Sequence, residues 1–579
     1  MQTSQTKFIA LFLSASLLSG SVMSQKFFKK TPKATHWVDS VYNSLTPDQR
    51  LAQLMVLRES GLENGQPEIY GEKVMDLIKR YNIGGICLFQ GSPKDQAQVL
   101  AGLQNAAQTP LMVCIDGETG LGMRMDGVDK FPDQLTMGAI RNGKDLIYKI
   151  GAAMARQCIR MGIQVNYAPV VDINNNPANP VIGYRSFGQD KNVVADYGVA
   201  IMKGMQNEGI MACAKHFPGH GDVSVDSHLD LPVIEKSLPE LEKLELVPFK
   251  KVFKAGIGSV MIAHLSIPKI EPTPHLASSL SHKFVTDLLR KKIGFTGLSF
   301  TDALGMKGVA KYFPQGEVCV MSLKAGNDML CLPEDVGLGI EKINAAIQKG
   351  ELSWTELEPR VKKVLYAKYH LGLSSADSKN IASQNLTQDL NKEVASLSSV
   401  VAKRALTAVR LENNRFIPLS PNKKTAYLQV GGKPEDILAK SLEDNAGTRN
   451  YYFGYSDDLS EANEILSQIK TGKFDRIVVS IEGFSKRPAD NFQISTAALK
   501  LIRDIGDYNH SATLMVMGNP YALKNFTGYK NLLVSYEDGS VFQQAVSDFL
   551  LGKAGAQGKL PVTVTENLPF GTGLVIKKG

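Results

Sequence analysis

The chain has 579 residues, of which 43% are hydrophobic and 21% are charged. This composition is typical of a globular protein, and the length exceeds what one hydrophobic core can serve, so two or more domains are expected. The formal net charge of +8 is modest, and no basic stripe with interleaved aromatic residues occurs, which excludes a nucleic-acid partner.

Residues 1–24 have the pattern of a secretory signal peptide. Lys7 precedes an apolar run over residues 8–18, and small residues follow up to a cleavage site near Ser24. The run is shorter than the roughly 20 residues that cross a bilayer, and no other stretch comes close, so we expect no transmembrane segment. The sequence therefore predicts a soluble protein that is exported to the periplasm or the extracellular space.

The chain contains six cysteines, with no Cys-x-x-Cys spacing of the kind that binds metals. Export permits disulfides, but the cysteines lie mostly in apolar runs within the first two thirds of the chain. We therefore expect buried free thiols. The residues are Cys87, Cys114, Cys158, Cys213, Cys319 and Cys331.

Between residues 50 and 370, eight short apolar runs alternate with helical patterns. Near-continuous hydrophobicity is typical of parallel strands that are buried on both faces. Eight strand and helix units predict a (β/α)8 barrel, which we place at residues 34–375, with a doubly wound open sheet as the alternative. The expected strands are residues 53–59, 84–89, 111–116, 165–172, 212–217, 259–264, 297–303 and 328–333.

Charged and polar residues stand at the C-terminal ends of many of these runs. In a barrel that edge carries the active site, whereas an open sheet gathers its ligands at one switch point. The distribution therefore favours the barrel. The residues are Asp116, Asp172, Lys215, His216, His264 and Asp302.

A polar stretch at residues 376–394 is interpreted as a linker, and residues 395–579 as a second domain. This domain begins with a helical pattern, "VASLSSVVAKRALTAV", and continues with further strand-like runs. The pattern predicts a small parallel α/β sandwich. Its expected strands are residues 425–430, 476–483, 512–520 and 531–537.

The loop "KHFPGHGDVSVDSH", residues 215–228, concentrates side chains that bind metals or transfer protons. Its candidate ligands are His216, His220, Asp222, Asp226 and His228. Proline and glycines within the loop break any helix, so no i, i+4 pair presents two ligands on one face. We therefore expect no metal.

Acid/base chemistry is the other interpretation of this loop. Asp226 and His228 are two residues apart, so in an extended segment their side chains point the same way. A carboxylate beside an imidazole raises the pKa of the imidazole and fixes its tautomer. A solvated loop with local turns is the alternative, and the nearby strand end at Lys215 and His216 favours the chemistry.

Asp302, in "LSFTDALGMKG", ends another predicted strand. It can cap the helix that follows. Together with an acid donor on a neighbouring loop, however, a second carboxylate at the barrel mouth suggests a nucleophile for glycosidic bond cleavage.

Three motifs, "ANPVIGYRSFG", "KHFPGHGDVSVDSH" and "SFTDALGM", together with the closing "GKLPVTV", resemble the family-3 glycoside hydrolases. The similarity is to the β-N-acetylglucosaminidase branch with a histidine acid/base, and it covers essentially the whole mature chain. One departure is "DGETGLGMRM", where Thr119 replaces a glycine that is common in the family, which bears on loop shape and specificity.

The resemblance implies that Asp302 is the nucleophile, His228 the general acid/base and Asp226 its partner in a dyad. It also implies a sugar-binding set. Each member of this set has a structural alternative: an aspartate can cap, an arginine can form an ion pair, and the lysine can be a buried counter-ion for Asp116 or Asp172. The set is Asp116, Arg124, Arg185, Lys215 and His216.

The implied activity is retaining exo-hydrolysis of terminal β-linked N-acetylglucosamine from peptidoglycan or chitin fragments, without a metal or organic cofactor. A spent imidazole is neutral and does not repel phosphate, so a phosphorylase is the main alternative. A β-glucosidase, a zinc hydrolase and a non-catalytic carbohydrate-binding protein are further alternatives. The sequence gives no indication of the oligomeric state.

Overall fold

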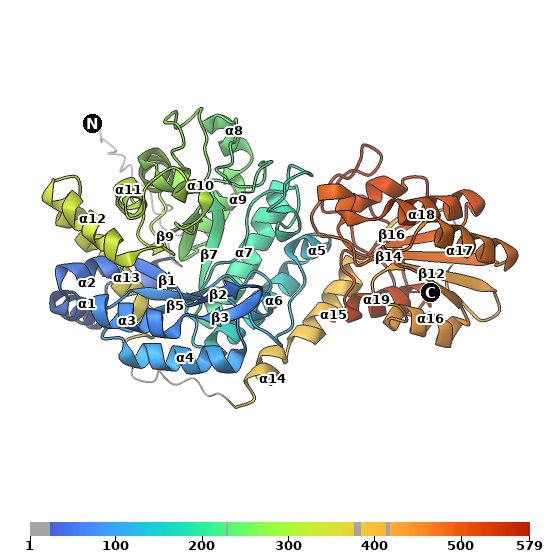
Figure 1. Cartoon of the computed structure of the whole chain (residues 1–579), viewed down its shortest axis with the longest axis horizontal. Coiled ribbons are helices and arrows are strands. Elements are labelled where there is room, and N and C mark those ends of the chain that lie inside the picture. Colours follow the sequence, from blue (N-terminus) through green and yellow to red (C-terminus); the bar gives the residue numbers. More distant parts are fainter. Residues whose placement is uncertain (1–23, 227–229, 376–383, 413–416, 579) are drawn as a thin grey trace, which may run out of the picture.

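The computed structural model describes residues 24–226, 230–375, 384–412 and 417–578. It contains two domains side by side, with helix α15 (Val394–Ala405) running between them (Figure 1). The predicted signal peptide lies outside the described residues except for Ser24, and His228 of the predicted dyad also lies outside them. None of the described helices is long and apolar enough to cross a membrane.

The first domain is a closed barrel of eight parallel strands, in the order β10-β1-β4-β5-β6-β7-β8-β9. A parallel bridge between Phe300 and Met329 joins β9 to β10 and closes it. The predicted barrel is confirmed, and each predicted run coincides with one strand, although β7 begins one residue before its run. The strands are β1 (Met55–Arg58), β4 (Gly85–Leu88), β5 (Met112–Ile115), β6 (Val165–Asn166), β7 (Met211–Phe217), β8 (Ser259–Ile262), β9 (Leu298–Thr301) and β10 (Leu330–Cys331).

Helices surround the barrel and bury the outer faces of its strands. Helix α7, for example, begins after Asp190, whose carboxylate accepts hydrogen bonds from the N–H groups of Asn192 and Val193. The helices are α1 (Pro32–Ser44), α2 (Pro47–Ala52), α3 (Gly71–Tyr81), α4 (Pro93–Ala106), α5 (Gln134–Gly138), α6 (Lys144–Arg160), α7 (Lys191–Glu208), α8 (Leu238–Lys243), α9 (Leu246–Lys254), the π-helix η5 (Lys283–Lys292), α10 (Lys307–Ala310), α11 (Glu317–Ala325), α12 (Val336–Gln348) and α13 (Trp354–His370).

A hairpin that was not predicted follows β1. Strands β2 (Ser60–Glu63) and β3 (Gln66–Ile69) pair antiparallel around Asn64 and Gly65, whose φ angles are 51° and 78°. An Asn-Gly pair suits a two-residue turn that needs two positive φ angles. The Asn-Gly signal for a turn was therefore present in the sequence. The two strands that flank it are polar and lack the hydrophobic alternation that predicts a strand.

The second domain has a six-stranded sheet in the order β11-β16-β15-β14-β12-β13. Helices α16 and α19 cover one face, and α17 and α18 cover the other (Figure 1). The predicted α/β domain is confirmed. Its elements are β11 (Thr407–Leu411), β12 (Thr425–Gly431), α16 (Ile437–Ala446), β13 (Arg449–Phe453), α17 (Leu459–Thr471), β14 (Arg476–Glu482), α18 (Thr496–Tyr508), β15 (Thr513–Val516), β16 (Asn531–Val534) and α19 (Ser540–Leu550).

Two details of this domain correct the prediction. Strand β11 pairs antiparallel with β16, so the sheet is not wholly parallel. The predicted helix also stops early: α15 ends at Ala405, and β11 begins at Thr407. The β-branched side chains of Thr407 and Val409 suit a strand better than a helix.

The predicted linker includes a helix, α14 (Leu386–Asn391), which packs against α6 and α4 of the barrel. Asp389 pairs with Arg160 of α6 at 2.8 Å, and the Asn391 amide donates to the Gly127 carbonyl at 2.9 Å. The described part of this segment therefore lies along the barrel surface.

All six cysteines are buried and free, as predicted. Four of them, Cys87, Cys114, Cys213 and Cys331, belong to barrel strands. Burial raises the pKa of the Cys114 thiol to about 12, which keeps it protonated and unreactive at neutral pH.

A polar cluster at the domain boundary joins the two domains. Lys486 of the second domain pairs with Asp133 of the barrel at 2.5 Å. A carboxylate oxygen of Glu537, also in the second domain, accepts hydrogen bonds from the Thr136 hydroxyl at 2.6 Å and from the Asp133 N–H at 3.0 Å. The Lys486 ammonium also lies 5.2 Å from the ring of Tyr184. The second domain therefore holds the barrel through one ion pair and the hydrogen bonds of Glu537.

We predict that Glu537→Gln removes a pH dependence from this interface. Burial, and then the neighbouring Asp133, raise the pKa of Glu537 from 4.5 to about 8. Between these pH values the folded protein keeps a proton that the unfolded chain has lost, so the free energy of unfolding decreases as pH rises. The urea midpoint should therefore fall more in wild type than in the variant between about pH 5 and about pH 8. An equal fall of the urea midpoint in wild type and in the variant would contradict this role of Glu537.

Candidate active site

A cavity of about 150 Å³ opens at the C-terminal ends of the barrel strands. We call it the inner cavity. It brings together six of the eight predicted site residues, which come from the ends of β5, β7 and β9 and from the loops after β5 and β6. They are Asp116, Arg124, Arg185, Lys215, His216 and Asp302.

Lys215 is the central cation of the site. Its side chain is 2% exposed, and its ammonium pairs with Asp116 and, at 2.6 Å, with Glu118. Arg124 binds the second carboxylate oxygen of Asp116 at 2.5 Å and its carbonyl at 3.1 Å. Although burial raises the pKa of a carboxyl group, Lys215 and Arg124 hold the pKa of Asp116 well below its usual range.

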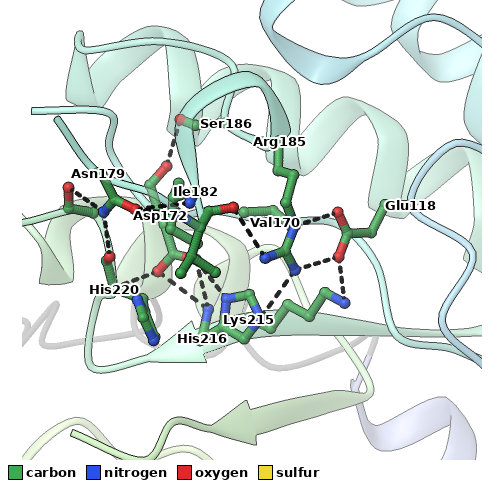
Figure 2. A network of polar contacts seen from close by, with 12 residues as sticks. Glu118, Val170, Asp172, Asn179, Ile182, Arg185, Ser186, Lys215, His216 and His220 are labelled. Carbon is green, nitrogen blue, oxygen red and sulfur yellow. Dashed lines mark hydrogen bonds and ion pairs between the residues drawn. The ribbon is translucent and has the colours of Figure 1, made fainter. Parts of the chain in front are cut away.

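Glu118 connects this cluster to Arg185 and was not among the predicted site residues. Its oxygens accept two hydrogen bonds from the Arg185 guanidinium, at 2.6 and 2.9 Å, in the bidentate arrangement shown in Figure 2. Burial raises the pKa of Glu118, but Arg185 and then Lys215 lower it overall to about 2. The sequence signal that could have identified Glu118 as a site residue was its position two residues after Asp116.

Asp172 positions the end of β7, the strand that carries Lys215 and His216 of the sugar-binding set. Its carboxylate accepts hydrogen bonds from Nδ1 of His216 at 2.7 Å and from the backbone N–H of His220 at 2.7 Å (Figure 2). Nε2 of His216 lies 3.3 Å from Arg185, which can only donate. His216 therefore holds its proton on Nδ1. Asp172 is not the counter-ion of Lys215, because that role belongs to Asp116 and Glu118.

Asp302 follows β9 and faces the inner cavity from the opposite side of the barrel. One of its oxygens accepts a hydrogen bond from the Ala303 N–H at 2.8 Å. Burial raises its pKa, but His264 and His216 lower it overall, so the carboxylate is ionised at neutral pH. Asp302 does not cap α10, whose N-cap residue is Met306. The capping alternative is therefore wrong for that helix.

The predicted dyad is not placed by the described residues. Asp226 is described but is not among the residues that line the inner cavity, and His228 lies outside the description. The loop is anchored nearby: Asp230 binds Lys311 at 2.8 Å and the Tyr312 hydroxyl at 2.5 Å. The roles of Asp226 and His228 stay predictions.

The possible metal ligands of this loop do not gather in the described structure. Asp222 pairs with Lys236 at 2.6 Å, and the ring of His220 stands beside that of His216. Burial, and then His216, lower the pKa of His220 to about 4. Within the described ranges, no three His, Cys, Asp or Glu side chains are arranged to hold a metal ion.

We predict that Glu118→Gln strongly destabilises the protein. It removes the shared partner of two buried cations, and breaking a buried ion pair costs about 3–5 kcal/mol. Glu393→Gln is the control, because Glu393 pairs with Arg156 at the surface, where both side chains are 42% exposed, and such pairs contribute about 0–1 kcal/mol. Urea unfolding measures both. A similar small loss in each variant would show that the network is not a buried, mutually dependent cluster.

Comparisons with known proteins agree with this architecture. The chain matches the model "Glycosyl hydrolase family 3 N terminal domain" over residues 46–367. It is 28% identical over 554 residues to beta-hexosaminidase A of Pseudoalteromonas piscicida, covering 85% of this chain and 91% of that protein. It is 25% identical over 557 residues to the beta-N-acetylglucosaminidase/beta-glucosidase of Cellulomonas fimi, covering 91% and 95%.

A solved structure of a family 3 β-N-acetylglucosaminidase from Paenibacillus sp. str. FPU-7 is also similar. The TM-score is 0.73 at 26% identity, and the match covers 90% of this chain and 99% of that chain. The similarity thus extends over both domains, and the family model spans every barrel strand. The chain therefore belongs to glycosyl hydrolase family 3, as its motifs suggested.

Proposed function

We propose that the protein is a retaining exo-β-N-acetylglucosaminidase that removes terminal β-linked N-acetylglucosamine. The observation that carries this proposal is the inner cavity, where the ionised Asp302 faces a set of buried, paired cations and carboxylates. The relatives named above, hexosaminidases or N-acetylglucosaminidases that match most of the chain, support the choice of sugar.

In the first step, Asp302 attacks the anomeric carbon. A bond forms between its carboxylate oxygen and that carbon while the glycosidic bond breaks. The predicted acid, His228, gives its proton to the leaving oxygen, so that a neutral alcohol departs. Ala303 holds one oxygen of Asp302 through its N–H, which orients the carboxylate before the substrate arrives.

In the second step, water attacks the glycosyl-enzyme ester. His228, now neutral, takes a proton from the water, and Asp302 leaves as a carboxylate. The same imidazole therefore serves first as acid and then as base, and the configuration at the anomeric carbon is retained.

The charged network holds the sugar that is attacked. Asp116 and Lys215 present a carboxylate and an ammonium that suit sugar hydroxyls. Arg124 keeps the carboxylate of Asp116 in place, and Arg185 keeps that of Glu118 in place. Because these groups are already paired and buried, they need little rearrangement when charge develops in the transition state.

The alternatives differ in measurable products. The relative from Cellulomonas fimi carries both names, β-N-acetylglucosaminidase and β-glucosidase, so a glucoside is the first competing substrate. Phosphorolysis would yield a sugar 1-phosphate. A non-catalytic binding protein would bind the sugar and form no product.

Export and a polymer substrate form part of the proposal. The pattern of residues 1–24 supports export, which would place the enzyme beside polymers of the cell envelope. Peptidoglycan or chitin fragments are the proposed natural substrates, because both contain β-linked N-acetylglucosamine.

We predict that Asp302→Asn abolishes chromophore release from an aryl N-acetyl-β-glucosaminide, with a loss of about 1,000-fold or more. His228→Ala should lose about 100-fold to 10,000-fold. The same assay is carried out with the matching glucoside, and also with added phosphate. Preference for the acetamido sugar supports the proposal. An unaffected Asp302→Asn would show that the nucleophile is wrongly assigned, and a sugar 1-phosphate product would identify a phosphorylase.

We predict that Asp226→Asn moves the alkaline limb of the kcat/KM profile to lower pH. His228 must be protonated in the first step, so activity is lost as pH rises through its pKa, and a neighbouring carboxylate raises that pKa. The lowered pKa of Asp302 keeps that carboxylate ionised at neutral pH, so its protonation does not limit activity there. A limb that stays in place would refute the dyad.

A further inference from the structure

His264 is a buried histidine to which the proposed mechanism gives no role. It lies two residues after β8, it is 0% exposed, and it is not among the residues that line the inner cavity. A buried imidazole needs partners for its ring nitrogens, because an unpaired polar atom away from water costs free energy. The groups that pair with this ring are therefore informative.

Nε2 of His264 lies 2.9 Å from the carbonyl oxygen of Ala303, the residue that directly follows the proposed nucleophile. A carbonyl can only accept a hydrogen bond, so Nε2 is the donor and carries a proton in either charge state of the ring. The same carbonyl accepts a hydrogen bond from the Met306 N–H at 3.0 Å, which closes a turn. His264 therefore ties the turn after Asp302 to the end of β8.

The backbone of Ala303 links this histidine to the nucleophile. Its N–H donates to a carboxylate oxygen of Asp302 at 2.8 Å, and its carbonyl accepts from His264. On either side of it, the N–H groups of Asp302 and Leu304 donate to carbonyl groups of β8 and β10, both at 2.9 Å. The orientation of the Asp302 carboxylate thus depends on how the peptide groups of Ala303 are tilted, and His264 fixes one of them.

Further contacts hold the ring of His264 in this orientation. Nδ1 lies 2.6 Å from the hydroxyl oxygen of Ser279, which can donate to the neutral ring. Ser279 belongs to the 3-10 helix η4 (Ser278–Leu280), and its carbonyl accepts a hydrogen bond from the Asn327 amide at 2.8 Å. The Ser278 hydroxyl donates to the Ala263 carbonyl at 2.6 Å. Because both serines and Asn327 are buried, these contacts fix the ring where water does not reach.

A purely structural role is the alternative for His264. A leucine, however, would fill a similar volume without the free-energy cost of burying two ring nitrogens. His264 instead directs its Nε2–H at the residue whose own N–H binds the nucleophile. Burial raises the pKa of Asp302, and His264 makes the largest contribution that opposes this effect. Its contacts and its charge therefore both act on the nucleophile.

We propose that His264 is a positioning residue for the nucleophile. It holds the Ala303 carbonyl, so that the Ala303 N–H fixes one oxygen of Asp302 and leaves the other to form the bond with the anomeric carbon. This inference rests on the proposed glycosidase function and adds a residue that acts through Ala303 without lining the inner cavity. A misplacement of a reacting group by about 1 Å can cost about 100-fold in rate.

The test uses three substitutions in the full chain and one matched control. His264→Leu removes the donor and keeps a similar volume, whereas His264→Gln keeps an N–H group near the position of Nε2. Ser279→Ala keeps the ring and removes the hydroxyl beside Nδ1. Ser259→Ala is the control, because Ser259 is equally buried and also donates to a backbone carbonyl, at 2.9 Å, but lies at the start of β8 and does not line the inner cavity.

Two quantities are measured for each protein: kcat/KM for an aryl N-acetyl-β-glucosaminide, which reports attack by Asp302, and the Kd of N-acetylglucosamine by calorimetry. We expect His264→Leu to lower kcat/KM by about 10-fold to 100-fold and Ser279→Ala by about threefold to tenfold. His264→Gln should retain at least about three times the kcat/KM of His264→Leu, and every Kd should stay within about twofold of wild type, since the cluster around Lys215 is unchanged. Ser259→Ala should keep the wild-type kcat/KM.

Three results would overturn the positioning role. They are a His264→Leu variant with the wild-type kcat/KM, a loss of sugar binding as large as the loss of kcat/KM, and a His264→Gln variant no more active than His264→Leu. Urea unfolding checks that each variant is folded under the assay conditions. If His264→Leu does not fold, Ser279→Ala and Ser259→Ala decide, and equal activities in these two would also overturn the inference.

The failure of this inference is distinct from failure of the proposed function. If wild type leaves the aryl N-acetyl-β-glucosaminide uncleaved, or if Asp302→Asn loses no activity, the glycosidase assignment itself is wrong. If wild type cleaves it, Asp302→Asn is inactive and His264→Leu keeps its activity, the glycosidase assignment stands and only the role of His264 fails.

Discussion

The rest of the site depends on the compensation of one buried charge, the ammonium of Lys215. An ammonium that is 2% exposed is stable only when carboxylates replace the water it has lost. Asp116 and Glu118 do this, and each then needs a cation of its own, which Arg124 and Arg185 provide. The members of this cluster depend on its two carboxylates: removing Asp116 leaves Arg124 without its carboxylate, and removing Glu118 leaves Arg185 without its carboxylate.

The closed barrel makes this compensation possible. Asp116 follows β5, Lys215 lies near the end of β7, and Asp302 follows β9, so the three reach one cavity only because the sheet curves back on itself. The charged cluster around Lys215 and the proposed nucleophile, Asp302, then lie on different sides of the inner cavity. A bound sugar would lie between a prearranged set of polar groups and an ionised carboxylate, which is the arrangement that favours charge separation in the transition state.

The second domain supports the site from outside. The described residues that line the inner cavity all belong to the barrel, but Lys486 of the second domain lies against Tyr184, the residue before Arg185, and pairs with Asp133. Asp133 is 11% exposed at this boundary, and Lys486 contacts the ring of the residue before Arg185, so separation of the domains would remove a contact from the segment that carries Arg185. The role of the second domain at the site is therefore one of positioning.

Much of the molecule was determined by local sequence. The eight strands and the position of Asp302 at a strand end follow from short apolar runs and the residues that end them, because strand formation and burial depend on neighbouring residues. The partners of Lys215 were a different matter: Glu118 is 97 positions away in the chain (215 − 118), and no local pattern reports that distance in space. The link between Asp172 and His216 likewise arises from segments far apart in sequence. Only the closure of the barrel decided which charges meet, because ion pairing depends on separation in space and not along the chain.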